Sequence, residues 1–178
     1  MKKPTIILVN DTDHLDYQTA CIIFGMLNAW NIPFTHATFY TLESEDEYPS
    51  HPNSLARHCF ENETASFTDV NKSKYINLLN HQINQGNEIA YHGYSQISNN
   101  RDRFLKGLNE INKYLSKPMT TYIEHGGNTK YHPVEGCKKE TLSLYGNKEN
   151  SEYYVRDLIS EKFNQAWCHF DLVNPLNN

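Results

Sequence analysis

Short apolar runs rich in β-branched residues alternate with segments of helical periodicity, and this alternation limits the fold more than any other feature. Thr5–Val9 is the unbroken kind of run found in strands buried on both faces. Asp16–Trp30 follows, with apolar residues at helical spacing: Ile22, Ile23, Met26, Leu27 and Trp30. The further expected elements are strands Phe34–Tyr40, Glu88–Tyr91, Met119–Ile123 and Ala166–Leu172, and helices Asn71–Gln85, Arg101–Leu115 and Ser151–Phe163. Such alternation predicts a parallel sheet with right-handed crossovers. We therefore expect residues 1–178 to form a single α/β domain.

The composition argues against several classes of function. The net charge is −5 and no basic stretch stands out, so nucleic acid is not an expected partner. No apolar run approaches the ~20 residues of a membrane span. The apolar run near the start, Ile6–Val9, is shorter than the ~7–15 residues of a secretory signal, so we expect a cytoplasmic protein. The cysteines form no C-x-x-C pair, which argues against a zinc knuckle or a thioredoxin-like motif.

Polar side chains follow three of the predicted strands at their carboxyl ends. Asp11 and Asp13 follow the first strand, His92 ends the third, and Glu124 and His125 follow the fourth. Because parallel strands end at the same edge of a sheet, these residues should share one rim. Both aspartates could face one pocket, since residues i and i+2 of an extended segment point the same way. Two carboxylates with one or two histidines predict a site for zinc or a similar divalent ion, with the second carboxylate as general base for a water molecule.

The same residues could instead have a purely structural role, and the sequence alone does not decide between this role and metal binding. The segment NDTDH, residues 10–14, could be an N-cap cluster ahead of the following helix, because Asp and Thr are preferred there. His92 taken singly could be a capping or satisfied histidine. The N-cap interpretation does not explain the histidines across the rim, so a metal site is the favoured hypothesis.

Three motifs carry a resemblance to a known family. VNDTD is followed by a helix and by IPFTHATF, the segment Gly86–Gln96 reads GNEIAYHGYSQ, and KPMTTYIEHGG comes after a further helix. In this order they resemble the polysaccharide deacetylase family (carbohydrate esterase family four, the NodB-homology domain) over most of the chain. The resemblance implies a distorted (β/α) barrel, here stopping short of the family's last strands. It also implies a metal-dependent hydrolase, with zinc the favoured ion, that removes an N- or O-acetyl group from a carbohydrate.

The resemblance further implies roles at the metal. Asp13 would be a metal ligand and Asp11 the catalytic base, although these roles could be reversed because the family's two aspartates are adjacent. His92 would be the first histidine ligand, and Gln96 stands where the family has the second. An amide oxygen is a weaker zinc ligand than imidazole, so His125 could supply the missing nitrogen or act in catalysis.

Substrate contacts are implied for Tyr94, Glu124 and Gly126. Tyr94, like Tyr91, could stack on or hydrogen-bond a sugar. Gly126 or Gly127 could stabilise an oxyanion through its backbone N–H. Glu124 stands, with His125, where the family has the arginine that orients its base.

The same departures from the family pattern support a second interpretation. Gln96 and Glu124 are also what we would expect of a catalytically inactive deacetylase-like barrel that binds a carbohydrate or a protein. A barrel without its last strands exposes sheet edges, which would favour a homodimer. A metal-dependent hydrolase remains the preferred hypothesis, because Asp11, Asp13 and His92 are all present.

Overall fold

The computed structural model describes residues 7–10, 17–40, 74–94, 100–125 and 145–167. Within these ranges the predicted alternation of strand and helix is confirmed, with element ends that differ by a few residues. The elements in chain order are β1 (Val9–Asn10), α1 (Tyr17–Ala29), β2 (Thr35–Phe39), α3 (Lys74–Asn84), β3 (Glu88–Gly93), α4 (Arg101–Asn112), β4 (Thr121–Ile123), α6 (Arg156–Lys162) and β5 (Gln165–Trp167).

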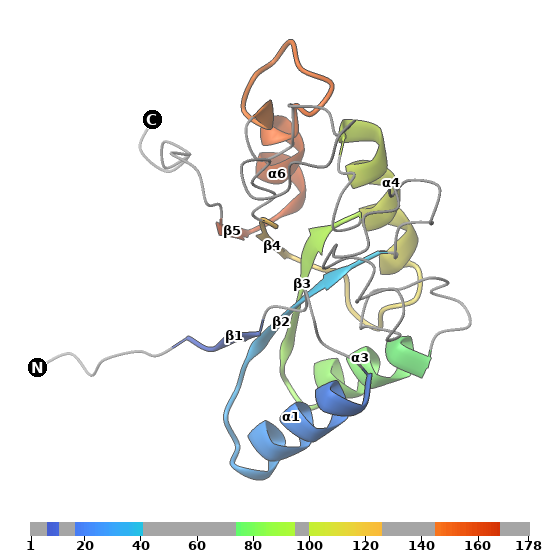
Figure 1. Ribbon diagram of the computed structural model, residues 1–178, viewed down its shortest axis with the longest axis vertical. Helices are drawn as coiled ribbons and strands as arrows, with labels where there is room; N and C mark the ends of the chain where they lie inside the picture. The colour runs from blue at the N-terminus through green and yellow to red at the C-terminus, as the bar shows by residue number, and fades with distance from the viewer. Residues whose placement is uncertain (1–6, 11–16, 41–73, 95–99, 126–144, 168–178) are drawn as a thin grey trace, which may run out of the picture.

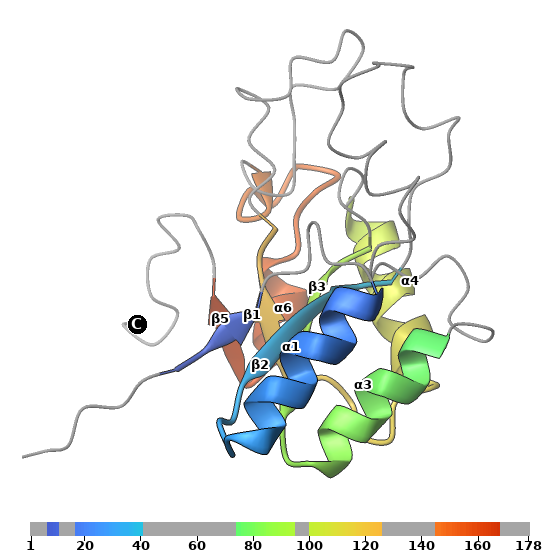
Figure 2. The same cartoon turned by 60° about the horizontal axis from the view of Figure 1, so that its bottom comes forward.

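The strands form one 5-stranded sheet in the order β1-β2-β3-β4-β5, and every neighbouring pair is parallel. Each connection moves to the next strand in the same direction, so right-handed crossovers place the helices on the same side of the sheet. Figures 1 and 2 show the described helices on that side, with the sheet curled into a half-barrel. The protein is therefore α/β, and its sheet is consistent with part of a (β/α) barrel, in which strand carboxyl ends carry the functional site.

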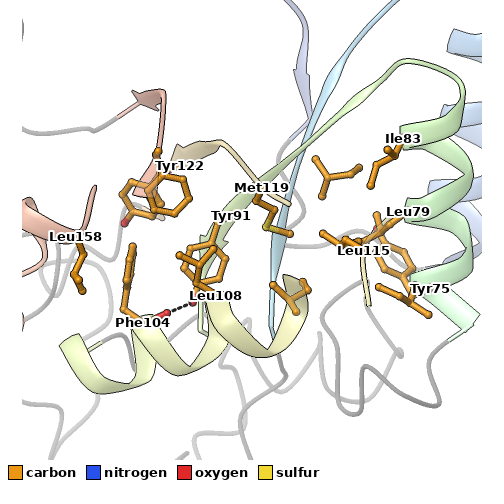
Figure 3. Close-up of a cluster of buried hydrophobic side chains, with 14 of the residues drawn as sticks. Tyr75, Leu79, Ile83, Tyr91, Phe104, Leu108, Leu115, Met119, Tyr122 and Leu158 are labelled. Atoms are coloured by element: carbon orange, nitrogen blue, oxygen red, sulfur yellow. Dashed lines mark hydrogen bonds between the residues drawn. The ribbon is translucent and has the colours of Figure 1, made fainter. Parts of the chain in front are cut away.

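An aromatic cluster on the helix side of the sheet fixes β3 and β4 against α4 (Figure 3). The Phe104 ring lies edge-on to Tyr91 and Tyr122, with ring centroids 5.1 Å and 5.2 Å apart. The Tyr91 hydroxyl donates a hydrogen bond of 2.8 Å to the Phe104 carbonyl, which satisfies the polar end of a fully buried ring. β3 is thus held in place at Tyr91, one residue before His92.

The prediction that the first strand is buried on both faces is wrong for its described part. Ile7 and Val9 are 59% and 38% exposed. The reason is the position of β1 at the edge of the sheet, where it pairs over two residues and only with β2. An unbroken apolar run indicates a strand, but it cannot distinguish an edge strand from a central one.

The predicted apolar set of helix α1 is buried only in part. Ile23 and Leu27 pack against the core, whereas Ile22, Met26 and Trp30 are exposed. The most deeply buried residues of the helix are Ala20 and Phe24. The segment is apolar on more than one face, so its periodicity does not choose between them. No helix in the described ranges, α1 included, is both long enough and apolar enough to cross a membrane.

Gly107 lets α4 pack closely on β3, and we expect Gly107→Ala to destabilise the protein. A Cβ atom at this position would lie 2.5 Å from the Tyr91 hydroxyl oxygen and 3.1 Å from the Tyr40 Cβ. Because Tyr91 is buried and hydrogen-bonded, relieving this overlap should cost about 1–3 kcal/mol. That cost outweighs the ~1 kcal/mol by which Ala is the better helix former. Urea denaturation should show a net loss of up to about 2 kcal/mol.

Gly25→Ala in α1 is the matched control. Nothing lies within 4 Å of a Cβ atom built there, so this variant should gain up to ~1 kcal/mol in the free energy of unfolding. A Gly107→Ala protein as stable as Gly25→Ala would contradict the close packing of α4.

Candidate functional site

The carboxyl ends of β2, β3 and β4 bring together Phe39, His92 and His125. The two histidine rings lie edge to face with centroids 5.3 Å apart. Phe39 contacts both of them, with centroid distances of 4.6 Å to His92 and 5.2 Å to His125. The expectation that strand topology alone would gather these two histidines at one rim is therefore confirmed.

A β-bulge aims the His92 side chain. The β2–β3 register passes from Thr38 opposite Tyr91 to Phe39 opposite Gly93, so His92 is an extra residue in β3. Gly93 has φ 136°, a conformation that strains residues with a side chain, and it allows the strand to resume its pairing. Bulges are common beside active sites, where they re-aim a side chain.

The tautomer of His92 follows from its hydrogen bond. Nδ1 lies 2.7 Å from the carbonyl oxygen of Ile123 in β4. A carbonyl oxygen can only accept, so Nδ1 carries the proton, and in the neutral ring Nε2 then carries the lone pair. A histidine that ligates a metal usually donates its other ring N–H to a carbonyl or carboxylate in this way. The chemistry of His92, which is 2% exposed, thus fits a metal ligand.

Glu124 directly follows β4 and pairs with β5. It is 8% exposed, and its backbone N–H donates a hydrogen bond of 2.8 Å to the Trp167 carbonyl of β5. That bond extends the β4–β5 pairing by one residue beyond Ile123. The backbone of this buried residue is thereby held in the sheet, one position before His125.

Tyr94 packs on the helix side of the rim. Its ring centroid is 5.4 Å from that of Tyr40, and the Arg103 and Lys106 side chains of α4 lie over it at 5.5 Å and 5.9 Å. Uninterrupted alternation would have put Tyr94 on the same face as His92, and the bulge reverses this. A sugar contact by Tyr94, which is half-buried, stays a prediction. The same role for Tyr91 is wrong, because that ring is fully buried.

The remaining predicted site residues, Asp11, Asp13, Gln96 and Gly126, lie outside the described residues. Within the described ranges no three His, Cys, Asp or Glu side chains form a group that could hold a metal ion. His92 and His125 offer two nitrogen donors. The carboxylate donors that the motif NDTDH predicts would have to complete the site.

The sequence interpretation missed a second buried histidine, His36 in β2. Its Nδ1 lies 2.9 Å from Nδ2 of Asn10, and its Nε2 lies 2.8 Å from the Tyr75 hydroxyl oxygen. An amide nitrogen only donates, so Nδ1 accepts this hydrogen bond and Nε2–H donates to Tyr75. Burial, and secondarily the electrostatic interaction with His92, lowers the pKa of His36 to about 3, so the ring of His36 is neutral near pH 7. The sequence did contain a signal for this histidine. A polar residue inside a buried strand such as THATF needs a hydrogen-bond partner in the interior.

A carboxylate ties the same strands together near their amino ends. Glu88 of β3 accepts a hydrogen bond of 2.7 Å from the Thr35 hydroxyl of β2 and a short one from the Thr121 hydroxyl of β4. Both threonines are buried. This bridge lies at the opposite ends of the strands from the histidines, so its role is structural.

No protein-family model matches this chain, and no curated protein or solved structure is significantly similar to it. The resemblance to polysaccharide deacetylases stays a prediction carried by the three motifs, and the case for a function depends on the geometry at the rim.

Proposed function

We propose that this protein is a divalent-metal-dependent hydrolase that removes an N- or O-acetyl group from a carbohydrate, on a distorted (β/α) barrel of the polysaccharide deacetylase type. One observation carries the proposal. At a bulge beside the carboxyl end of β3, His92 donates Nδ1–H to the Ile123 carbonyl, which leaves Nε2 as the lone-pair nitrogen beside His125. This is the hydrogen-bonding pattern of a histidine prepared for a metal.

The proposed roles follow from the chemistry of each group. His92 binds the ion through Nε2, and the Ile123 carbonyl holds the ring in the required tautomer. His125 either supplies a second nitrogen or moves a proton during the reaction. Asp13 and Asp11 are the proposed ligand and base, with Gln96, Glu124 and Gly126 around the substrate. A divalent ion such as zinc would polarise an acyl carbonyl and lower the pKa of a water molecule.

A buried aromatic side chain lies against the histidine pair, and a buried carboxylate lies next to it in the chain. Phe39 contacts both rings, and Glu124 is buried next to His125 in the chain. Electrostatic interactions are stronger where water is excluded, so a carboxylate and an ion would influence each other strongly at this rim. This environment supports a catalytic site over a simple surface ion site.

Metal content measured in protein purified without chelator tests the proposal. We expect roughly one zinc, cobalt or nickel ion per chain in the wild type and at least about tenfold less in His92→Asn. The asparagine amide can still donate to the Ile123 carbonyl, so this variant removes Nε2 with little effect on the strand pairing. His81→Ala, at an exposed histidine of α3, is the control for adventitious binding and should retain the metal.

The second part of the experiment measures acetate release from a panel of N- and O-acetylated sugars. Wild-type protein and His81→Ala should release acetate, and His92→Asn should not. If metal binds and no sugar is deacetylated, the hydrolase proposal loses its substrate class. If the wild type binds none of the three ions under any loading condition, the inactive carbohydrate- or protein-binding barrel becomes the better interpretation.

A further inference from the structure

The exposed apolar side chains of the described residues gather at one edge of the sheet. Apart from Trp167 of β5, all the large apolar side chains that are well exposed in these ranges belong to β1, α1 and the residues that flank them. They are Ile7, Leu8, Val9, Ile22, Met26, Trp30 and Ile32, each between 37% and 66% exposed. We call these seven residues the β1–α1 face. Single exposed apolar residues are ordinary, but a set gathered on one side of a protein indicates an interaction surface.

The exposed stripe of α1 points away from the neighbouring helix. On the side of α3, Asn28 donates a hydrogen bond of 2.9 Å to the Gln82 side chain. Met26 lies two residues before Asn28, which is about 200° around a helix, and Ile22 and Trp30 lie one turn to either side of Met26. Figure 2 shows α3 along one flank of α1 and no described helix along the other. Because α1 connects β1 to β2, this open flank adjoins the edge strand β1.

The described part of β1 lacks the features that prevent sheet edges from pairing. The Thr35 N–H donates to the Leu8 carbonyl, so the main-chain groups of Val9, one residue later, point to the open side of the strand. Edge strands of monomeric proteins usually carry a lysine, a proline or a bulge against pairing with another chain. Residues 7–10 read ILVN, and β1 pairs with β2 without a register shift. This edge is therefore suited to pairing with a further strand.

The β1–α1 face contains no charged residue. Asp, Glu, Lys and Arg make up 21% of the chain, yet none of them occurs from residue 17 to residue 40. Such a face offers no attraction to a strongly charged partner. The whole chain has a net charge of −5, so two copies repel each other least where this face meets its own copy. The charge distribution therefore favours a second copy of the chain as the partner.

The size of the face is also sufficient for a dimer. At their exposed fractions the seven residues present on the order of 400 Å² of apolar surface. A standard interface covers about 800 Å² of each partner, and somewhat more than half of that area is apolar. The β1–α1 face thus supplies roughly the apolar area that a stable dimer requires.

We propose that the β1–α1 face binds a second copy of this chain and forms a symmetric homodimer. A two-fold axis brings the same face of each copy together. The described helices lie on one side of the sheet, so α1 can meet α1 of the second copy only if the two β1 strands run antiparallel. The inference is independent of the proposed hydrolase function, because it uses neither His92 nor His125.

Sedimentation equilibrium of the full chain over a range of concentrations measures the dimer directly. We expect the wild type to have twice the mass of one chain. The double variant Ile22→Lys/Met26→Lys should have a dimer dissociation constant at least about 30-fold higher, because dimerisation would bury unpaired charges in an apolar contact. Both positions are exposed and lysine is a good helix former, so circular dichroism should show a folded protein.

Trp167→Lys is the matched control. It replaces an exposed apolar residue with lysine at the opposite edge of the sheet, on β5, and this variant should dimerise like the wild type. A second test uses the oppositely charged variant Ile22→Glu/Met26→Glu. Each double variant should be monomeric alone, and an equimolar mixture of the two should form a heterodimer, because the α1 stripe of one copy meets that of the other.

The outcomes distinguish this face from the other edge of the sheet. Loss of the dimer in both double variants, its recovery in their mixture and its retention in Trp167→Lys support the proposal. A dimer that only Trp167→Lys disrupts would place the interface at β5 and overturn it. Double variants that stay monomeric when mixed would show that the face does not meet its own copy. A wild type that is monomeric at every concentration would also overturn the proposal, and would leave the face to a different protein or to another part of the same chain.

Discussion

Lowering the pH from about 7 to about 4 should destabilise the wild-type protein by roughly 3 kcal/mol more than a His36→Gln variant. The pKa of His36 is about 3 in the folded protein, below the ordinary value of 6.5, because the ring is buried. Between these two values the unfolded chain binds a proton and the folded protein does not. Stability is therefore lost as the pH falls below about 6.5, at ~1.4 kcal/mol per pH unit, until the folded protein also binds the proton near pH 3.

Urea denaturation of both proteins at several pH values provides the measurement. Glutamine cannot take up a proton, and its amide can still accept from Asn10 and donate to Tyr75. The variant should be less stable than the wild type near pH 7, with the difference shrinking as the pH falls. Parallel pH dependences for the two proteins would show that His36 is not a buried neutral histidine.

Glu88→Ala should lower the free energy of unfolding by about 2–4 kcal/mol. The carboxylate bridges three strands, and its removal leaves the buried hydroxyls of Thr35 and Thr121 without their acceptor. Each buried polar group that loses its partner costs about 1–3 kcal/mol. Glu88→Gln retains one carbonyl oxygen and should cost roughly half as much. Chemical denaturation near neutral pH would measure both.

Glu161→Ala serves as the comparison for a carboxylate at the surface. Glu161 is paired with Lys162, but its side chain is 66% exposed, so its loss should change stability by less than about 0.5 kcal/mol. Equal effects of Glu88→Ala and Glu161→Ala would mean that the bridge between strands does not stabilise the sheet.

The sequence predicted the order of strands and helices and the meeting of His92 with His125, because both follow from periodicity and from parallel topology. It did not predict the bulge at His92. A glycine after a histidine is compatible with a regular strand end, and only the β2–β3 register shows that an extra residue is present. Regular alternation also puts Tyr94 on the same face of the strand as His92, and the bulge puts it on the opposite face.

Other features depended on which residues meet across the fold. The hydrogen bond from Asn10 to His36 requires β1 and β2 to be aligned so that these two residues are neighbours, a register that the sequence does not specify. The exposure of Ile7 and Val9 likewise depends on β1 lying at the sheet edge. Local patterns indicate the type of an element, and its neighbours decide how each side chain is used.

The central claim is that Nε2 of His92 carries a lone pair prepared for a divalent ion. Long-range ¹H–¹⁵N correlation spectra of histidine-labelled protein, recorded with and without zinc, test it most directly. We predict that His92 is protonated on Nδ1 without metal, and that zinc shifts its Nε2 resonance while the Nδ1 proton remains. A proton on Nε2, or an Nε2 resonance that saturating zinc does not shift, would contradict the account.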